Sequence, residues 1–345
     1  MKIAIIGHFG GKKQFSDGQT VKTRTLYHAL ADEGLSICPI DTYDFKCNLL
    51  RFIWQFCKSM VSCKKYIVLL SENGRRKLFP VLYILIKLFR KQVYHDAIGG
   101  RLADEVQNKS HFKRYVSAFS GNWVESHLLE KRLQEQGVKN ALYLPNFKQI
   151  TPLTQNQLPP AANKPMRFCT FSRVMREKGV GDAINALAQL NKGKNTTAVL
   201  DIYGPIDPAF AAEFERLLAT HQSFCNYKGI VPADESVNVL KNYDMLLFPT
   251  YWKGEGMPGT IIDAFCAGVP ILARWWTYCD EMIAHQKTGW VYDFDKPEKL
   301  GTWLAYAVAH PQEIYAMKKD CLTAGKAYTA KTVVPDILEL LEGSI

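Results

Sequence analysis

The sequence has 345 residues, of which 47% are hydrophobic and 22% are charged, and its formal net charge is +10. This length predicts two domains of ordinary size, and the composition is that of a folded protein and excludes a disordered chain. The nine cysteines are scattered without a CxxC pair, which argues against a disulfide framework or a zinc site and favours a reducing cytosol.

Apolar runs alternate with helical patterns from the first residues onward. The run at 2–7 is expected to be a β-strand and not part of a signal peptide. Further strands are expected at 65–70, 92–98, 140–145, 167–172, 198–204, 244–250 and 270–273. Helices are expected at 20–33, 122–136, 180–191, 208–220 and 260–267. Strands that alternate with helices in this way predict parallel sheets with helices on both faces.

A stretch without periodicity divides the pattern, because residues 150–165 contain four prolines. We expect an N-terminal domain at 1–150, a linker at 151–166, a second domain at 167–325 and a C-terminal helix at 326–345 that packs on the first domain. Two Rossmann-like domains of this kind would bind ligands beyond the carboxyl ends of their strands, in the cleft where the domains face each other.

The positive charge is concentrated in residues 46–91, which contain eleven lysines and arginines against Glu72 alone. The segment is also rich in Phe, Ile, Leu and Trp, and basic plus apolar residues suggest a face that lies on an anionic membrane. A buried helix with solvated ends is an equal alternative. Nucleic acid is disfavoured because no binding motif accompanies the charge. The longest apolar run, 78–89, is interrupted by Lys87, so no segment is expected to cross a membrane.

Two stretches in the first half carry candidate ligand-binding groups. The glycine-rich stretch "GHFGGKKQFSDGQTVKT" would let a ligand approach the backbone, and the helix that starts at Thr20 would offer N–H groups to an anion. Its glycines are Gly7, Gly10, Gly11 and Gly18. The stretch "YHDAIGG" places His95 and Asp96 at the end of an expected strand, where they could form a polar pair. A lone histidine is, however, more often structural.

The second half has two stronger candidates. In "FSRVMREKG", Arg173 and Lys178 follow a strand, and two fixed cations there could neutralise a diphosphate without a metal. The alternative is a solvated surface pair. In "YWKGEGMPGTIIDAFCAGVPIL", Glu255 stands between glycines, Thr260 is a candidate N-cap, and Asp263 lies one turn into a helix. Such carboxylates can accept hydrogen bonds from vicinal hydroxyls of a sugar and a ribose, whereas Asp263 could instead only favour the helix dipole.

One motif points to a metal but is discounted. The stretch "DFD", residues 293–295, copies the metal-binding Asp-x-Asp that one class of sugar-transferring enzymes carries. No other carboxylate cluster accompanies it, and it is expected to be a strand end and turn. We therefore expect no metal and no cofactor.

Taken in order, these stretches resemble the retaining nucleotide-sugar glycosyltransferases of family four. The motifs that carry the resemblance are the glycine-rich loop, "SGNWVESHLLEKRLQEQGVKNALYLPNF", "SRVMREKG", "IYGPID", "YKGIVPADE", "LLFPTYWKGEGMPGTIIDAFCAGVPILA" and "TGWVYD". The resemblance runs from Met1 to about Asp293 and is loose between residues 40 and 95. It implies the GT-B architecture, with two facing Rossmann-like domains, parallel sheets and an interdomain cleft.

The resemblance also implies roles for single residues. Arg173 and Lys178 would hold the donor diphosphate, Glu255 would face the transferred sugar, and His95 would be the histidine of the cleft. The remaining donor-binding residues would be Gly18 near the phosphates, Gly229 and Ile230 at the base, Gly256, Met257, Pro258, Gly259 and Thr260 at the sugar and phosphates, and Asp263 at the ribose. The family signature has Glu where this chain has Asp263, so that contact would be displaced or bridged by water.

The expected function is transfer of a sugar, with retention of configuration, from a nucleotide-sugar to a lipid-linked or nascent polysaccharide of bacterial type. A UDP-sugar is the expected donor because UDP-sugars are common donors. The protein would be cytoplasmic and peripheral at the inner face of the membrane. The alternatives are a glycosyltransferase that makes a soluble disaccharide or glycosylated metabolite, and a non-catalytic partner that binds sugar nucleotides. The nucleotide base, the sugar, the acceptor and the linkage stay open.

Overall fold

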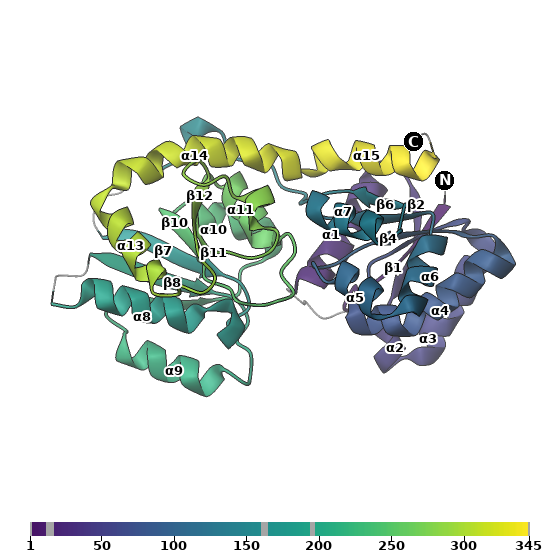
Figure 1. Ribbon diagram of the computed structural model, residues 1–345, viewed down its shortest axis with the longest axis horizontal. Helices are drawn as coiled ribbons and strands as arrows, with labels where there is room; N and C mark the ends of the chain where they lie inside the picture. Colours follow the sequence, from purple (N-terminus) through teal and green to yellow (C-terminus); the bar gives the residue numbers. More distant parts are fainter. Residues whose placement is uncertain (1, 12–16, 160–164, 194–196, 344–345) are drawn as a thin grey trace. The chain divides into compact units, whose positions relative to one another are not determined.

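The computed structural model describes residues 2–11, 17–159, 165–193 and 197–343 (Figure 1). The chain forms two compact units, one of Met1–Gln149 with Ala330–Ile345 and one of Ile150–Thr329. The residues expected to be a linker belong to the second unit and are described at 151–159 and 165–166. There the Leu153 amide donates to the Cys266 carbonyl over 2.8 Å. The rest of that segment, 160–164, lies outside the described residues.

The first unit is built on a six-stranded sheet in the order β2-β1-β3-β4-β5-β6. All neighbouring strands are parallel. The strands are β1 (Lys2–Gly7), β2 (Ser36–Asp41), β3 (Lys65–Val68), β4 (Gln92–Asp96), β5 (Gly121–Val124) and β6 (Ala141–Tyr143). Strand β1 is buried on both faces after Lys2, as expected for a central strand of a parallel sheet covered by helices.

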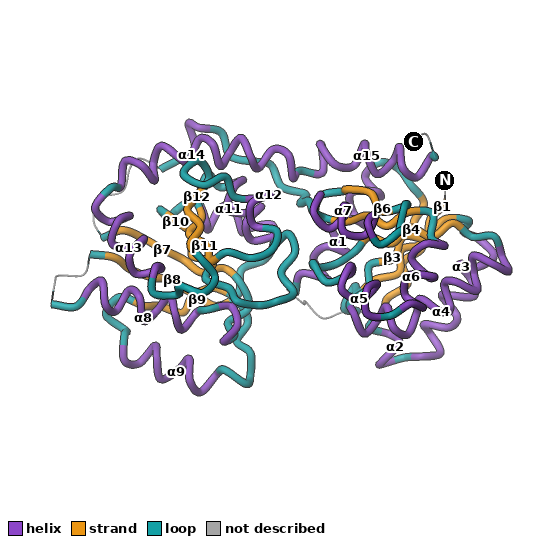
Figure 2. Tube along the Cα trace, in the orientation of Figure 1, coloured by secondary structure: helices purple, strands orange, loops and turns teal. Residues whose placement is uncertain are grey.

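Helices cover both faces of this sheet (Figure 2). They are α1 (Gly18–Asp32), α2 (Asp44–Cys47), α3 (Leu49–Ser62), α4 (Glu72–Phe89), α5 (Leu102–Asn108), α6 (Ser110–Ala118), α7 (His127–Glu135) and α15 (Ala330–Glu342). Helix α15, yellow in Figure 1, contacts α1 and buries Val333, Ile337 and Leu341 in the same apolar cluster as Ile3 and Ile5. The last helix therefore completes the core of the first unit.

The second unit holds a sheet in the order β12-β11-β10-β7-β8-β9, again with parallel neighbours. Its strands are β7 (Met166–Phe171), β8 (Ala198–Tyr203), β9 (Cys225–Gly229), β10 (Met245–Phe248), β11 (Ile271–Arg274) and β12 (Gly289–Tyr292). Its helices are α8 (Val180–Asn191), α9 (Ala211–Thr220), α10 (Ser236–Leu240), α11 (Gly259–Cys266), α12 (Cys279–Met282), α13 (Lys299–Ala309) and α14 (Pro311–Gly325). Short 3₁₀ turns are η1 (Gln155–Gln157), η2 (Arg176–Lys178), η3 (Ala233–Glu235) and η4 (Lys326–Tyr328).

The strand order of the second sheet creates a switch point. Strand β7 comes first in the unit, and the chain then adds β8 and β9 on one side and β10, β11 and β12 on the other. The loops that follow β7 and β10 therefore leave neighbouring strands at the same edge in opposite directions. This is the place where open α/β sheets bind ligands.

The α/β fold with two parallel sheets that the alternating pattern predicts is confirmed, and one expected helix is wrong at its start. The helix expected at 122–136 begins only at His127, and Gly121–Val124 form the buried strand β5 instead. The tryptophan and valine of this short strand fit a helical pattern as well as a strand pattern. Among the described residues, no helix is long and apolar enough to cross a membrane.

Candidate functional site

A lysine and a glutamate form an ion pair at the switch point of the second sheet. Lys178 ends η2 after strand β7, and Glu255 lies in the loop after strand β10. The Lys178 ammonium pairs with Oε1 of Glu255, and the Thr250 hydroxyl donates to the same oxygen over 3.0 Å. The two side chains are 17% and 8% exposed, so the pair is shielded but open to a ligand. Within the described part of the chain, Oε2 of Glu255 accepts no hydrogen bond.

The two loops that carry this pair are joined through their backbones. The Tyr251 amide donates to the Glu177 carbonyl over 2.9 Å. Gly179 has a φ of 70°, and a Cβ there would lie 2.2 Å from the Pro249 carbonyl oxygen. Only glycine allows that approach, so the turn after β7 is packed directly on the end of β10. The ion pair is thus held by backbone contacts beneath it.

Arg173 brings a second cation to the same edge. It is exposed in the loop after β7, and in the described residues its guanidinium makes no ion pair. The loop is fixed below it by Gly204, which has a φ of 127° and whose added Cβ would meet the Ser172 carbonyl oxygen at 1.9 Å. Arg173 and Lys178 therefore lie at the same edge of the sheet, and the binding of an anionic ligand by these two cations stays a prediction.

The residues after Glu255 lead into helix α11, but not in the way expected. Pro258 occupies the N-cap position, and Thr260 lies inside the helix, so the prediction that Thr260 is the N-cap is wrong. The Gly256 carbonyl accepts a hydrogen bond from Nε1 of the buried Trp276 over 3.0 Å, which anchors the loop. Asp263 is only 3% exposed, so its carboxyl lies inside the unit and is less open than the sequence suggested.

The remaining donor-binding candidates of this unit lie at the same edge or in its loops. Strand β9 ends at Gly229, whose φ is 79° and whose carbonyl accepts from the Gly204 amide over 2.8 Å. Ile230, the next residue, is exposed. Met257 is buried, whereas Pro258 and Gly259 are half-buried. The carboxyl edge of the second sheet therefore brings together the predicted residues that follow β7, β9 and β10.

The glycine-rich loop of the first unit differs from its prediction. Asp41 at the end of β2 accepts hydrogen bonds from the amides of Phe9, Gly10 and Gly11 over 2.8, 3.4 and 2.8 Å. These amides are therefore already occupied by a carboxylate of the chain. Sequence reasoning missed Asp41, which is followed by a turn but has no recognisable motif. Residues 12–16 of this loop lie outside the described residues.

Two other glycines of the same stretch contrast with each other. A Cβ on Gly7 would meet Thr23 at 2.6 Å, so Gly7 is required by the packing of helix α1. A Cβ on Gly18 would meet none of the described residues within 4 Å. Packing against the described residues does not require glycine at position 18, and the approach of a ligand there stays a prediction. The helix start itself is capped, because Asp17 accepts from the Thr20 amide over 3.1 Å.

His95 does not lie at the surface, and the prediction that it is the histidine of the cleft is not compatible with its position. Its ring is fully buried and packs edge-on against Phe79, with centroids 5.0 Å apart, and near Phe119. Burial, reinforced by the charge of Arg75, holds the pKa of His95 well below its usual range, so the ring is neutral. His95 is a core residue. Because side chains alternate along a strand, Asp96 points to the opposite face and cannot form the expected pair with it.

Asp96 instead joins a buried cluster of three charged side chains. The Lys22 ammonium lies 2.6 Å from Asp96 Oδ1 and 2.7 Å from Glu125 Oε1, and it donates to the Ala97 carbonyl over 3.0 Å. Burial raises the pKa of Asp96 to about 6, although Lys22 opposes this. Burial alone would lower the pKa of Lys22, but the two carboxylates raise it above its usual value. The contact between Lys22 and Glu125 could not be predicted from the sequence, because their spacing does not show that α1 and the end of β5 lie next to each other.

The "DFD" stretch follows strand β12 and forms a turn, as expected. Asp293 is exposed and forms a local ion pair with Lys296 over 2.6 Å. In the described ranges, no three His, Cys, Asp or Glu side chains are grouped so that they could hold a metal ion.

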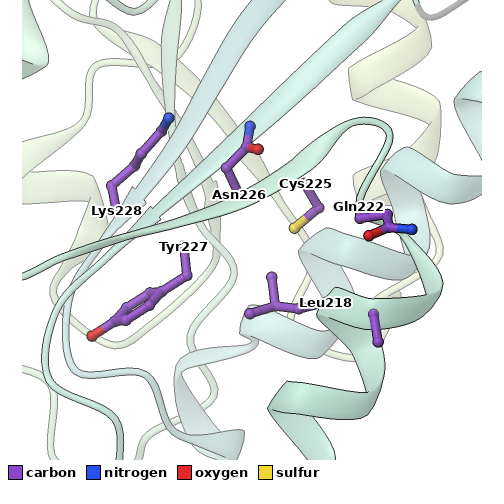
Figure 3. Close-up of a pocket in the computed structure, with 7 residues that line it drawn as sticks. Leu218, Gln222, Cys225, Asn226, Tyr227 and Lys228 are labelled. Carbon is purple, nitrogen blue, oxygen red and sulfur yellow. The ribbon is translucent and has the colours of Figure 1, made fainter.

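A surface hollow elsewhere in the second unit is not part of this site. Figure 3 shows it between α9 and β9, lined by Leu218, Gln222, Cys225, Asn226, Tyr227 and Lys228. Cys225 begins strand β9, so the hollow starts at the amino end of the sheet. Its polar groups are used internally, since Asn226 donates to Asp201 over 3.0 Å and Tyr227 to the Gly204 carbonyl over 2.9 Å.

Comparison with solved structures defines the fold. The protein is similar to HepE of Anabaena, solved with UDP and glucose, with a TM-score of 0.74, 14% identity and 99% coverage of both chains. It is also similar to sucrose-phosphate synthase of Thermosynechococcus elongatus, with a TM-score of 0.78, 16% identity and coverage of 99% and 98%. These are GT-B glycosyltransferases, and the fold predicted for this chain is confirmed.

Comparison of sequences gives the family. The amylovoran biosynthesis glycosyltransferase AmsK of Erwinia amylovora is 25% identical over 138 residues, which are 38% of this chain and 33% of AmsK. The chain spans about a third of the length of the curated relatives that it matches. Residues 154–320 match the model of the family described as glycosyl transferases group 1. This segment, which contains the Lys178–Glu255 pair, belongs to the group 1 glycosyl transferases.

Proposed function

We propose that the protein is a retaining glycosyltransferase that moves a sugar from a nucleotide-sugar, a UDP-sugar in the first place, to a lipid-linked or nascent polysaccharide. The observation that carries this proposal is the Lys178–Glu255 pair at the switch point, with Arg173 exposed beside it. The group 1 family match supports it, and so do AmsK, named for amylovoran biosynthesis, and HepE, solved with UDP and glucose.

The pair suits a sugar diphosphate because it offers both signs of charge at one edge. Arg173 and Lys178 can hold the two phosphates, and the diphosphate gains negative charge as it leaves, so these cations stabilise the transition state more than the ground state. Oε2 of Glu255 can accept a hydrogen bond from a sugar hydroxyl. We infer that these side chains, and no metal ion, balance the charge of the leaving group.

The proposed reaction is a same-face displacement at C1 of the donor sugar. The bond between C1 and the diphosphate oxygen breaks, and the acceptor hydroxyl oxygen forms the new bond to C1 on the same face. The departing phosphate oxygen takes the proton of that hydroxyl, so no separate base is needed. Glu255 and the amides that follow it position the sugar, and most of the rate enhancement comes from positioning and electrostatics.

The other predicted donor contacts stay part of the proposal. The loop from Gly256 to Thr260 would present amides to the sugar and phosphates, and Gly229 with Ile230 would meet the base. Asp263 would reach the ribose from inside the unit, through water because it is buried. Gly18 of the first unit would lie near the phosphates.

Calorimetric titration with UDP, GDP, ADP and CDP tests the donor site. One nucleotide should bind the wild-type protein, and Arg173→Ala should weaken that binding about tenfold or more, because a charge-assisted bond to phosphate contributes about 1.5–3 kcal/mol. Arg176→Ala is the matched control, since Arg176 lies three residues away but is engaged with Glu213 on α9. Failure of all four nucleotides to bind, or an equal loss in both variants, would contradict the proposal.

The acceptor and membrane parts of the proposal are supported by helix α3. Its exposed face carries an apolar stripe at helical spacing, formed by Leu50, Ile53, Trp54 and Val61, with Leu50 82% and Val61 91% exposed. Helices of soluble proteins normally turn such a stripe inward. On α4, Ile84, Leu88 and Phe89 are exposed as well.

Helices α3 and α4 are linked to each other at their C-terminal ends by a lysine. The Lys91 ammonium donates to the carbonyls of Met60 and Cys63 over 2.6 and 2.8 Å and so links the end of α4 to that of α3. Several cations of the segment are used inside the fold, such as Arg75, which pairs with buried Glu105 over 2.7 Å. The exposed cations without an ion pair in the described residues are Lys58, Lys64, Lys77, Lys87 and Arg90. Each would add about 1 kcal/mol on an anionic surface.

We infer that this face lies on an anionic bilayer and brings the enzyme to a lipid-linked acceptor at the inner face of the membrane. Sedimentation with vesicles of phosphatidylglycerol and phosphatidylcholine tests this. Changing Lys58, Lys64 and Lys87 to Gln should lower partitioning about a hundredfold, while the same change at Lys287, Lys299 and Lys319 of the second unit should not. Equal binding of both triple variants, or binding to pure phosphatidylcholine as strong as to the mixture, would contradict the membrane part.

A soluble acceptor is the second candidate function. It is favoured by the structural similarity to sucrose-phosphate synthase, which is named for a soluble product. If the protein transfers sugar to a water-soluble acceptor at the same rate with and without vesicles, the hypothesis of a soluble acceptor replaces that of a lipid-linked acceptor. Both readings share the donor site.

A further inference from the structure

Most of the exposed large apolar side chains of the second unit follow strands that end at one edge of its sheet. Among the described residues of this unit, five large apolar side chains are exposed, namely Ile230, Trp252, Trp275, Tyr306 and Tyr315. The first three follow strands β9, β10 and β11, whereas the two tyrosines lie on α13 and α14. Carboxyl ends of parallel strands lie at the same edge, so this edge carries exposed indoles in addition to the Lys178–Glu255 pair.

Trp252 is the exposed indole that belongs to the same loop as Glu255. It is 47% exposed, and a Cβ on Gly254 would lie 2.7 Å from its Nε1 atom. The indole therefore lies over Gly254, and a larger residue there would displace it. The backbone of the loop is fixed as well, because the Glu255 amide donates to the Trp252 carbonyl over 3.2 Å and the Trp252 amide to the Thr250 hydroxyl over 3.3 Å. Thr250 also donates to Oε1 of Glu255, so the backbone of Trp252 and the carboxylate of Glu255 share one hydrogen-bonding partner.

An exposed indole beside a carboxylate matches the chemistry of a pyranose ring. A pyranose presents C–H groups on its faces and hydroxyls around its rim. An indole offers a large, rigid apolar face to the C–H groups, while a carboxylate accepts from the hydroxyls. A lone exposed tryptophan is otherwise unremarkable on a protein surface, but here the indole lies over Gly254 in the loop that carries Glu255.

We propose that Trp252 is a stacking platform for the pyranose ring that binds beside Glu255, and that it helps to determine which sugars are accepted. This inference rests on the proposed function. The ring belongs to the donor or to the acceptor, since both have the same face chemistry, and the experiment separates the two sources.

The donor arm compares sugar nucleotides with the bare nucleotide by calorimetry. UDP-glucose, UDP-galactose and UDP-N-acetylglucosamine are titrated beside UDP into the wild-type protein, Trp252→Ala and Trp252→Phe. If the donor sugar stacks on Trp252, the Ala variant lowers the affinity for one UDP-sugar about 3–10-fold and leaves UDP unchanged, because an aromatic contact contributes about 0.5–1.5 kcal/mol. The Phe variant should recover most of that loss.

The acceptor arm uses octyl glucoside, octyl galactoside and octyl N-acetylglucosaminide below their micellar concentrations, with UDP present. Saturation-transfer NMR reports which ring protons contact the protein. If the acceptor ring stacks on Trp252, its C–H signals fall in Trp252→Ala and recover in Trp252→Phe. Trp54→Ala, an exposed tryptophan of helix α3, is the control and should change vesicle binding only.

Unchanged sugar binding in Trp252→Ala in both arms, with UDP still bound, overturns the platform and leaves the proposed function standing. Loss of vesicle binding in Trp252→Ala without loss of sugar binding overturns it as well and assigns the indole to a membrane contact. Failure of wild-type protein to bind UDP or any UDP-sugar contradicts the UDP donor on which this inference rests and overturns both.

Discussion

The carboxyl edges of the two sheets are built from similar residues but use them differently. At the first edge, Lys22 is enclosed with Asp96 and Glu125, and the amides of the glycine-rich loop are bound by Asp41. At the second edge, Lys178 and Glu255 form a pair that is partly open, and Arg173 and Trp252 are exposed.

This difference separates charges that stabilise the fold from charges that are available to a ligand. The groups of the first edge already satisfy one another, and their removal should be seen in stability. Those of the second edge have unused hydrogen-bonding capacity, and their removal should be seen in binding and rate. Changes at the first edge therefore test the role of these charges in stability, and changes at the second edge test their role in binding and rate.

The largest expected effect is on the stability of the first unit. Lys22→Met leaves two buried carboxylates without their cation, which should lower the free energy of unfolding by about 3–5 kcal/mol. Denaturant unfolding followed by tryptophan fluorescence measures this. Lys318→Met is the matched control in the second unit, because buried Lys318 donates to the Tyr243 carbonyl over 3.0 Å and pairs with no carboxylate in the described residues. An equal loss of unfolding free energy in both variants would show that the buried cluster of the first unit has no special role in stability.

At the second edge the expected effect is on rate. Lys178→Met removes a cation from the proposed diphosphate site and should lower the rate of nucleotide release from the donor about 10²–10³-fold. Arg176→Ala should leave that rate nearly unchanged. Coupled detection of released nucleoside diphosphate measures both. If Lys178→Met lowered stability but left the rate intact, the pair would be structural, like the cluster of the first unit.

The pH dependence of stability should report the enclosed cluster of the first unit. The pKa of Asp96 is raised to about 6, so the folded state binds its proton more tightly than the unfolded state, where the carboxyl has its ordinary value near 3.8. Its contribution therefore increases the free energy of unfolding as the pH falls from 7 through 6 toward 4, by up to about 3 kcal/mol. Asp96→Asn should flatten this slope in urea titrations at each pH. A slope that survives in Asp96→Asn would assign the effect to other carboxyls.

The smallest expected effect on the fold is at Gly18. Gly18→Ala should change the free energy of unfolding by less than about 0.5–1 kcal/mol, because the added methyl meets nothing and the residue lies at the start of a helix. Its effect on nucleotide affinity should be larger than its effect on stability if a phosphate approaches there. Gly179→Ala is the opposite case, since its methyl would meet the Pro249 carbonyl and the protein should be destabilised. Gly18→Ala with unchanged nucleotide affinity would remove Gly18 from the donor site.

Much of the fold could be predicted because the central strands are continuous apolar runs. Strands such as β1, β8 and β10 fall within the expected ranges. Besides β5, which was predicted as part of a helix, the sequence analysis missed β2 and β9; each is an edge strand of its sheet and is only partly buried. Strand β2 also contains Pro39, which is tolerated at an edge but weakens a strand pattern.

The candidate site could be predicted only where strand ends carried unusual residues. Arg173, Lys178 and Glu255 follow apolar runs, so the rule on carboxyl ends finds them. The contact between Lys178 and Glu255 could not be predicted, because it depends on β7 lying beside β10. Neither segment contains a pattern that determines this strand order. His95 failed for a related reason: its place at a strand end was correct, but the face to which it points is set by tertiary packing.

The place of helix α15 in the first unit has a consequence for synthesis on the ribosome. Residues 330–342 fill the core around Ile3 and Ile5, yet they are made after the whole of the second unit. At about 5–20 residues per second, the nascent first unit waits about 10–40 s with part of its core uncovered. During that time the second unit can complete its own core. A released chain truncated before Ala330 should therefore hold a protease-resistant second unit and a first unit that chaperones still recognise.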